Sequence, residues 1–245
     1  MIRDFLLALG FFTRIPVPAH PNYSDDAMRR SALYYPLVGL FVGALLAAIY
    51  GFAQLFWSVE VSVLLTLSAG FLLTGGFHED GWADTFDGFG GAFNKERKLD
   101  IMTDSRLGTY GSLALWAMLS LKAFTLFELL PQAGVICLIV AHCLSRWSSM
   151  TAMVFADYVR VNPSKAKPVV SQMSFGRWLA ALLFSLPALV FVPLHIALVL
   201  TVTALIVAAL WIWQTRRQIG GYTGDTMGAG QQLAELALYL VWLCF

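Results

Sequence analysis

Long apolar runs alternate with short polar segments along the chain, and these runs predict membrane-spanning helices. A helix needs about 20 mostly apolar residues to cross about 30 Å of hydrocarbon. The candidate spans are residues 32–57, 61–77, 111–130, 132–156, 178–213 and 233–245. The run 178–213 is long enough for a hairpin turning near Pro193 and His195, and Pro131 is the expected turn between its two neighbouring spans. We therefore expect an all-α, polytopic integral membrane protein with about six to seven transmembrane helices.

The first twelve residues predict an amphipathic helix that precedes these spans. Arg3 and Asp4 come before the apolar run 5–12, and no small-residue cleavage site of a signal peptide follows. No repeat or linker divides the rest of the chain. We expect residues 1–245 to form a single integral membrane catalytic domain.

Composition supports lipid as the main solvent. Hydrophobic residues make up 58% of the 245 positions and charged residues only 13%, whereas soluble domains carry about 25% charged residues. The formal net charge of +1 provides no basic field for nucleic acid. Membrane lipid is thus the expected partner.

The basic residues predict the orientation of the chain. The polar segments 14–31, 78–110, 157–177 and 214–232 fall on one side of the predicted spans. Of the sixteen Lys and Arg residues, fourteen lie outside the spans, all of them on this side. The positive-inside rule places that side in the cytoplasm. We expect a bacterial inner-membrane protein whose active-site loops face the cytoplasm.

An acid-rich segment directly follows the second predicted span. Asp80, Asp84 and Asp87 are spaced i, i+4 and i+7, which places them within an arc of about 60° on a helix, and Glu79 adjoins them. Carboxylates stacked so closely repel one another and favour a counter-ion. Oxygen ligands alone suit Mg²⁺ or Mn²⁺ better than zinc. A solvated helix face is the alternative; the position at the membrane surface favours a metal site.

A second acidic element follows at Asp100 and Asp104, with Arg106 two residues further on. Mg²⁺ usually binds through one or two carboxylates together with substrate phosphates. Two acidic elements around a phosphate, with an arginine nearby, indicate phosphoryl transfer.

Three cationic or titratable residues, Lys122, His142 and Arg146, lie inside predicted spans. Such residues face a cavity or a partner. Two interpretations remain open: a pocket for an anionic substrate, or a buried ion pair with Glu128 or with the acid cluster.

Further candidate substrate contacts lie near the membrane boundary. Lys165 and Lys167 precede a proline, and Arg14 either binds phosphate or extends its charge to the interface. Segment 220–230 fits a turn that offers N–H groups to phosphate or a helix with GxxxG packing, and Asp225 within it favours a site.

These segments together resemble the cobalamin synthase family. The resemblance rests, in chain order, on residues 11–16, 35–39, 74–88, 102–111, 142–147, 165–168 and 220–225. The aromatic residues Phe77 and Trp82 stand where leucine-like residues are more usual in the family.

The resemblance implies a Mg²⁺-dependent transferase acting on adenosylcobinamide-GDP and α-ribazole or its 5′-phosphate. A ribose hydroxyl attacks the phosphorus attached to cobinamide, and GMP leaves. The residues implied to bind the metal are Glu79, Asp80, Asp84 and Asp87. Those implied to be catalytic are Asp84, Asp87 and Asp104, among which the base stays open. Those implied to bind substrate are Arg14, Arg106, His142, Arg146, Lys165, Lys167 and Asp225. A homo-oligomer is possible.

Two other functions compete with this interpretation. Asp84-x-x-Asp87-Gly88 imitates the motif of CDP-alcohol phosphotransferases, but Gly91-Ala92 stands where that motif has Ala-Arg. A transporter lined by Lys122, His142 and Arg146 is the alternative of another class. Transporters often contain inverted repeats, and the sequence shows none.

Overall fold

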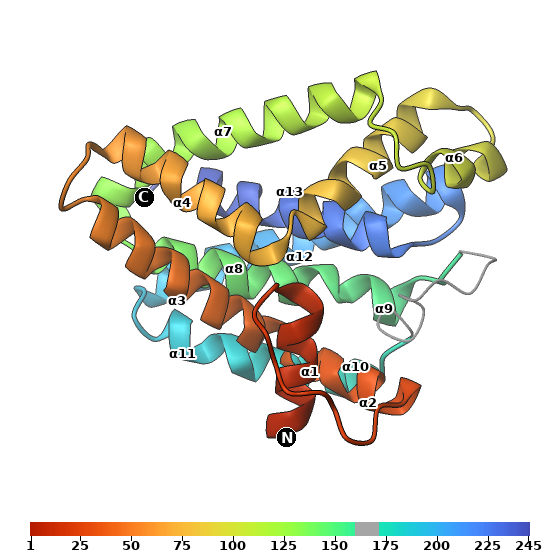
Figure 1. The fold of residues 1–245 in the computed structure, drawn as a ribbon, viewed down its shortest axis with the longest axis horizontal. Helices are drawn as coiled ribbons and strands as arrows, with labels where there is room; N and C mark the ends of the chain where they lie inside the picture. Colours follow the sequence, from red (N-terminus) through yellow and green to blue (C-terminus); the bar gives the residue numbers. More distant parts are fainter. Residues whose placement is uncertain (160–171) are drawn as a thin grey trace.

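The computed structural model describes residues 1–159 and 172–245, and within these ranges it contains helices and no strand (Figure 1). The helices before the acid cluster are α1 (Ile2–Phe12), α2 (Asp25–Ser31), η1 (Ala32–Tyr34), α3 (Tyr35–Ala53) and α4 (Val59–Thr74). The following helices are α5 (Phe77–Gly91), α6 (Lys95–Ile101), α7 (Thr109–Ala133), α8 (Ile136–Ser149) and α9 (Thr151–Phe155). The last are α10 (Phe175–Leu182), η2 (Leu183–Ser185), α11 (Leu186–Leu189), α12 (Leu194–Ile219) and α13 (Gly224–Trp242). The all-α class is confirmed.

Three of the described helical segments are long and apolar enough to cross a membrane. They are Asp25–Ala53, Thr109–Ala133 and Leu194–Ile219. A fourth follows if α4 and α5, which are bent by 88° relative to each other, form one broken span. The protein is therefore an all-α membrane protein, and the count of six to seven spans stays a prediction.

Two consecutive glycines form the bend between α4 and α5. Gly75 and Gly76 both have φ of +69°, a left-handed conformation in which a side chain is strained. Gly75 caps α4, its N–H donating to the carbonyl of Phe71, and α5 begins two residues later. The bend thus places the acid-rich helix directly at the end of an apolar one.

Two glycines one helical turn apart bring α3 against α8. A Cβ on Gly39 would lie 2.2 Å from the carbonyl oxygen of His142, and one on Gly43 would lie 2.7 Å from the Cα of Ile139. Small residues at this spacing let two backbones approach closely. This contact sets the position of α8, which carries His142 and Arg146.

The helix boundaries confirm one expected turn and correct another. Pro193 is the N-cap of α12, so the expected hairpin point is confirmed. The turn expected at Pro131 is wrong, because α7 continues through that proline to Ala133. Gly134, with φ of +69°, ends the helix instead. A proline near a helix C-terminus removes only one backbone bond, whereas a left-handed glycine stops the helix.

The N-terminal helix α1 buries one face against the bundle, through Ala8, Leu9 and Phe12, and leaves Met1 and Ile2 exposed. The expected amphipathic helix is thereby confirmed. The predicted last span, 233–245, covers the second half of α13. This helix starts earlier, at Gly224, within the segment 214–232 that was predicted to lie between spans.

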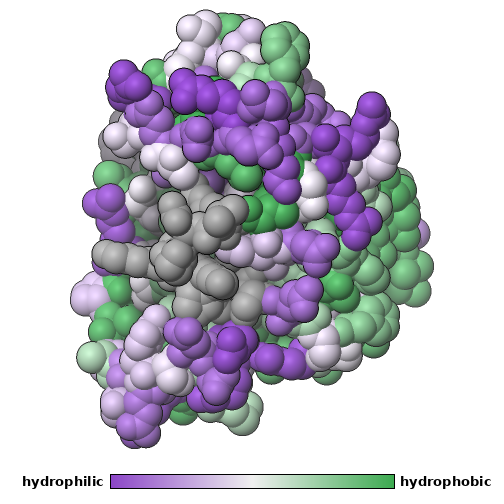
Figure 2. Space-filling model, turned by 90° about the vertical axis from the view of Figure 1, so that its right-hand side faces the viewer, coloured by the Kyte–Doolittle hydropathy of each residue, from purple (hydrophilic) through white to green (hydrophobic). Residues whose placement is uncertain are grey.

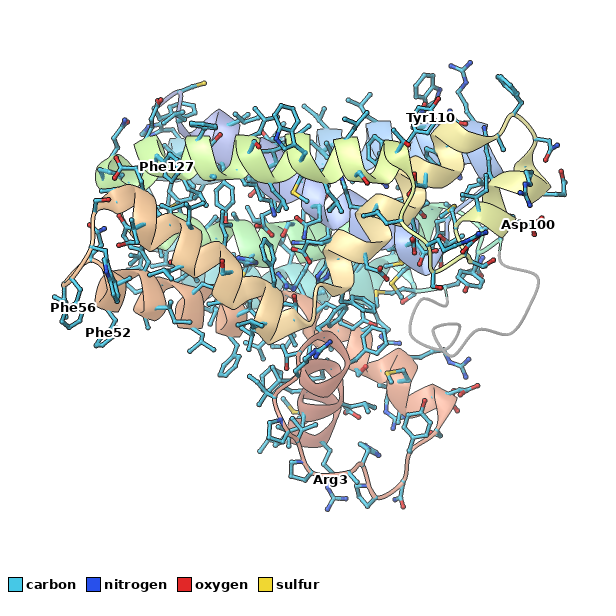
Figure 3. All side chains as sticks on the ribbon, turned by 45° about the horizontal axis from the view of Figure 1, so that its top comes forward. Arg3, Phe52, Phe56, Asp100, Tyr110 and Phe127 are labelled. Atoms are coloured by element: carbon cyan, nitrogen blue, oxygen red, sulfur yellow. The ribbon has the colours of Figure 1, made fainter. Side chains whose placement is uncertain are left out.

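Polar residues gather at the end of the molecule that carries α6 and α9. This end is largely hydrophilic, and an apolar flank adjoins it (Figure 2). Asp100 and Tyr110 lie at this polar end, whereas Phe52, Phe56 and Phe127 lie at the opposite end (Figure 3). The acid-rich segments thus share one end of the bundle.

Candidate active site

Helix α5 carries the acid cluster as one stripe with graded burial. Asp80 is exposed, Asp84 is half-buried and Asp87 is only 7% exposed. The helical spacing predicted for the three carboxylates is confirmed. Because the three carboxylates differ in burial, they lie in different environments. We therefore expect them to have different roles.

Asp87 binds the start of α7. Its two carboxylate oxygens accept the backbone N–H groups of Gly108 at 2.7 Å and Gly111 at 2.8 Å. A Cβ on either glycine would lie 2.4 Å from an Asp87 oxygen. The first N–H groups of a helix lack partners within it, and a carboxylate there also interacts favourably with the helix dipole. Asp87 therefore acts as a cap supplied by a neighbouring helix.

The loop before α7 carries the second acidic element. The Arg106 guanidinium donates to Asp104 from Nη2 at 2.6 Å and from Nε at 3.0 Å, and the Arg106 backbone N–H donates to the same carboxylate at 3.1 Å. The hydrogen bonds from Arg106 lower the pKa of Asp104 to about 2. Both residues lie at the surface. Because Gly108 is bound by Asp87, this exposed pair is held next to α5.

The N-terminus of α13 lies against the middle of the acid cluster. A Cβ on Gly81 would be 2.8 Å from the carbonyl oxygen of Asp225 and 3.0 Å from its Cα. Gly81 stands between Asp80 and Asp84 in the chain, so the backbone of α13 packs against α5 within the acid-rich segment. A capping box of Thr223 and Thr226 starts α13 at this point.

Segment 220–230 combines the two structures that the sequence left open. Gly220 is the left-handed C-cap of α12, and the chain turns at Gly221. Gly224 and Gly228 lie within α13. A Cβ on Gly228 would lie 3.5 Å from the Cα of His78. The segment is therefore a turn followed by a packing helix.

The intramembrane cations meet a carboxylate that sequence reasoning missed. Lys122 Nζ lies 2.8 Å from Oε1 of Glu235, and His142 Nδ1 lies 3.4 Å from Oε2 of the same residue. Glu235 is 3% exposed. The partner considered from the sequence, Glu128, is exposed. The signal was present, since Glu235 is the one charged residue in the apolar run 233–245.

Glutamine side chains of α13 extend this buried network. Gln231 donates to Glu235 at 2.7 Å and to the Ser145 hydroxyl at 2.9 Å. Gln232 accepts from Lys122 and donates to Glu79 at 2.8 Å. The network therefore joins α5, α7, α8 and α13, and Glu79 faces it instead of the exposed stripe.

The network surrounds a polar cavity of about 30 Å³. Two buried atoms of its lining residues have no hydrogen-bond partner among the described residues: Glu79 Oε2 and Gln231 Oε1. Buried polar groups without protein partners usually bind water, and this volume holds about two water molecules. His142 and Arg146 are thus deeply buried, and their role in binding substrate stays a prediction.

Arg14 lies over the bend between α4 and α5. Its backbone N–H donates to the Leu73 carbonyl at 2.8 Å, and a Cβ on Gly75 would lie 2.4 Å from its Nε. A cation here faces the C-terminus of α4, where the helix dipole is negative. The side chain is exposed, so it remains available to a phosphate. Lys165 and Lys167 lie outside the described residues.

The predicted magnesium site is not assembled from protein ligands alone. Within residues 1–159 and 172–245, no group of three His, Cys, Asp or Glu side chains could hold a metal ion. The donor chemistry nevertheless fits Mg²⁺, which binds through one or two carboxylates when substrate phosphates supply other ligands. Asp80 and Asp84, one turn apart on α5, provide such a pair.

Comparisons with known proteins agree with the resemblance seen in the sequence. Residues 4–243 match the family described as cobalamin-5-phosphate synthase. The chain is 46% identical to a protein of Shewanella amazonensis named adenosylcobinamide-GDP ribazoletransferase, over 98% of this chain and 94% of that protein. A protein of the same name from Leptothrix cholodnii is 44% identical, over 98% and 95% of the two chains. No solved structure matches.

Proposed function

Because the chain belongs to the cobalamin-5-phosphate synthase family, we propose that it is an adenosylcobinamide-GDP ribazoletransferase. It would join adenosylcobinamide-GDP to α-ribazole or its 5′-phosphate, release GMP, and so complete the nucleotide loop of adenosylcobalamin or its 5′-phosphate. The observation that carries the site assignment is the close contact of Gly81 with the backbone of Asp225, which brings the first turn of α13 to the acid-rich helix α5.

Asp80 and Asp84 would hold Mg²⁺, with Asp225 nearby, and the diphosphate of the substrate would supply further oxygen ligands. When bound, the ion withdraws electron density from the phosphate under attack and neutralises charge on the leaving group. Glu79 and Asp87 were also expected as ligands. Their carboxylates already bind Gln232 and the start of α7, respectively, so we assign them to holding α5 in place.

The chemical step is an in-line displacement at phosphorus. The ribose oxygen forms a bond to the phosphorus attached to cobinamide, the bridging P–O bond breaks, and its electron pair leaves with GMP. The hydroxyl proton passes to a carboxylate and then to water. Of the three candidate bases, Asp104 is a weak one because its pKa is about 2, and both Asp87 oxygens accept N–H bonds. We propose Asp84 as the base, because it stands one helical turn from Asp80 on the same face of α5, at the centre of the acid stripe.

Arg106 and Arg14 are the cations that we propose for the phosphate oxygens. Both are exposed, and Arg106 is held near α5 through the Asp87–Gly108 contact. Preorganised positive charge around a transferring phosphoryl group stabilises the charge that develops in the transition state.

The test is GMP release by the purified protein in detergent, given adenosylcobinamide-GDP and α-ribazole, first with Mg²⁺ and then with EDTA. We expect release with Mg²⁺, formation of a cobalamin product, and loss of both with EDTA. A folded, monodisperse protein that releases no GMP would contradict the proposed reaction, and release that survives EDTA would contradict the metal requirement alone.

The orientation is a separate proposal: α6 and the acid cluster face the cytoplasm of the inner membrane. Cys137 and Cys143 are buried and Cys244 is exposed, so replacement of Cys244 by serine gives a suitable background. In intact spheroplasts, an impermeant maleimide should label Gln132→Cys and not Arg97→Cys. The reverse pattern would show the opposite orientation.

A further inference from the structure

A second cavity of about 30 Å³ lies beside the polar one, and four aromatic side chains, those of Phe11, Phe12, Tyr35 and Phe77, form part of its wall. The lining residues on which the inference depends are Phe11, Phe12, Tyr35, Phe77, Arg146 and Met227. The rings meet mostly edge to face: the centroids of Phe12 and Tyr35 are 4.6 Å apart, and those of Phe11 and Phe77 are 5.2 Å apart. Such walls favour a flat aromatic ligand.

One buried cation reaches this aromatic cavity. Arg146 lines both cavities and is 2% exposed. Its Nη1 donates to the His142 carbonyl at 3.0 Å, whereas its Nε has no hydrogen-bond partner among the described residues. A buried donor without a partner costs free energy. The cavity is therefore lined mainly by apolar residues and by one arginine that has an unused N–H donor, which suits an aromatic ring that carries one acceptor atom.

The aromatic cavity lies next to the proposed site of reaction. Gly224 and Gly228 of α13 form part of its wall, and Asp225, which follows Gly224, lies against Gly81 of the acid stripe. His78, the residue two positions before Asp80, lines the cavity as well. The first turn of α13 therefore joins the cavity wall to the helix that carries the acid stripe.

We propose that the aromatic cavity is the subsite for the base of the ribazole substrate and that Arg146 Nε–H donates to the unsubstituted ring nitrogen of that base. This inference rests on the proposed function. The base is a benzimidazole, whose rings are apolar apart from one nitrogen bonded to ribose and one with a free lone pair. Guanine and adenine carry further polar groups on their edges, which these walls would leave without partners.

Binding requires the Phe77 side chain to move. The cavity as it stands holds about two water molecules, and a bicyclic ring is larger. Phe77 is 38% exposed and is the most accessible of the four aromatic rings. If its ring turns outwards, it vacates the space of one six-membered ring, and the incoming base takes over the edge contacts with Phe11, Phe12 and His78.

The first test compares two nucleophiles of the same shape, the α-ribosides of benzimidazole and of indole, in GMP release by the wild-type protein. Indole has a C–H group where the acceptor nitrogen should be. We expect kcat/KM to be about tenfold lower for the indole riboside, since one hydrogen bond to a charged donor is lost. In Arg146→Lys the ratio of the two values should fall towards one. Equal use of both nucleophiles by the wild type would overturn the proposal.

The second test does not depend on a variant of a buried charge. Phe77→Ala should enlarge the subsite, so that the riboside of a tricyclic naphthimidazole becomes a nucleophile while the KM for adenosylcobinamide-GDP stays within about twofold of wild type. Phe124→Ala is the matched control, because that ring is 67% exposed on α7 and far along the chain from the cavity. If the Phe77→Ala protein rejects the naphthimidazole riboside as the wild-type protein does, the proposed subsite is contradicted.

The two proposals fail in different ways. Absence of GMP release with any nucleophile contradicts the ribazoletransferase activity itself. If GMP release is normal but does not depend on the ring nitrogen or on the size of residue 77, the activity stands and the proposed aromatic subsite is contradicted.

Discussion

The carboxylate of Asp87 accepts the backbone N–H of Gly111 at 2.8 Å, although the two residues lie 24 positions apart on different helices. The second oxygen accepts from Gly108. A residue that the acid motif marks as a candidate ligand thus holds the start of α7, and with it the loop that carries Asp104 and Arg106, against α5.

Replacement of Asp87 should lower stability as well as activity. In Asp87→Asn, one oxygen becomes an NH₂ group that faces a backbone donor, which leaves a buried N–H without an acceptor and costs about 1–3 kcal/mol. Thermal unfolding in detergent should show a melting temperature several degrees below that of the wild type. Asp80→Asn, at an exposed position, is the control and should melt as the wild type does. An Asp87→Asn protein with unchanged stability and no activity would instead indicate a direct role in the reaction.

Gly111→Ala tests the same contact from the other helix. The new Cβ would lie 2.4 Å from an Asp87 oxygen and 2.8 Å from the Ala83 carbonyl, so α7 must shift away from α5. We expect a destabilisation of about 1–3 kcal/mol, measured by thermal unfolding. Gly51→Ala on α3 is the matched control, since no atom lies within 4 Å of its Cβ. It should be neutral or slightly stabilising, and an equal loss in both variants would contradict the packing argument.

Glu235 should be among the residues whose loss is most damaging to the fold. Glu235→Leu leaves the Lys122 ammonium buried without its carboxylate, and breaking a buried pair costs about 3–5 kcal/mol. The double variant Lys122→Met with Glu235→Leu removes both charges and should recover most of that loss. A double-mutant cycle of melting temperatures checks this expectation. Additive effects of the two single changes would show that the two residues are not coupled.

Asp84→Asn should reduce the rate of GMP release. Loss of a general base lowers kcat by about 10²–10⁴-fold, and loss of a metal ligand raises the Mg²⁺ concentration needed for half-maximal GMP release. Titration with Mg²⁺ at saturating substrates separates the two effects. Asp84→Glu, which keeps the carboxylate, should retain part of the activity. Wild-type kinetics in Asp84→Asn would remove this residue from the site.

Arg106→Ala should lower kcat/KM, because the cation proposed for the phosphate oxygens is lost, with little effect on stability, since exposed ion pairs contribute little. Arg106 also holds the pKa of Asp104 at about 2. Without the guanidinium, that pKa should rise towards the ordinary value of about 3.9, so the Asp104 carboxylate is lost as the pH falls between about 5 and 3. Because Asp84 is the proposed base, the acid limb of kcat/KM should keep its position. An acid limb that moves to higher pH in Arg106→Ala would show that Asp104 takes part in the proton transfer.

Several parts of the site follow from local sequence pattern. The i, i+4, i+7 spacing of Asp80, Asp84 and Asp87 predicts one helix face because helical periodicity depends only on positions along the chain. The amphipathic α1 follows for the same reason, whereas the break at Pro193 follows from the length of the apolar run 178–213 and the proline within it. The turn expected at Pro131 was wrong because two signals competed within four residues, and Gly134 ended the helix.

Partners distant in the chain could not be predicted in this way. Lys122 and Glu235 are 113 positions apart, and their pairing depends on how closely α7 and α13 pack. The same holds for Arg146, whose place between two cavities follows from the contact of α3 with α8 at Gly39 and Gly43. Local pattern contains no information on which helix faces meet.

The membrane class, the family and the set of acidic and basic residues are predictable from the amino-acid sequence, because hydrophobic run length and motif chemistry are properties of consecutive residues. The packing of the helices assigns which carboxylates face solvent, which one caps a neighbouring helix and which one neutralises the buried cations. Burial, hydrogen bonding and charge pairing arise where helices meet, and they give identical side chains different tasks.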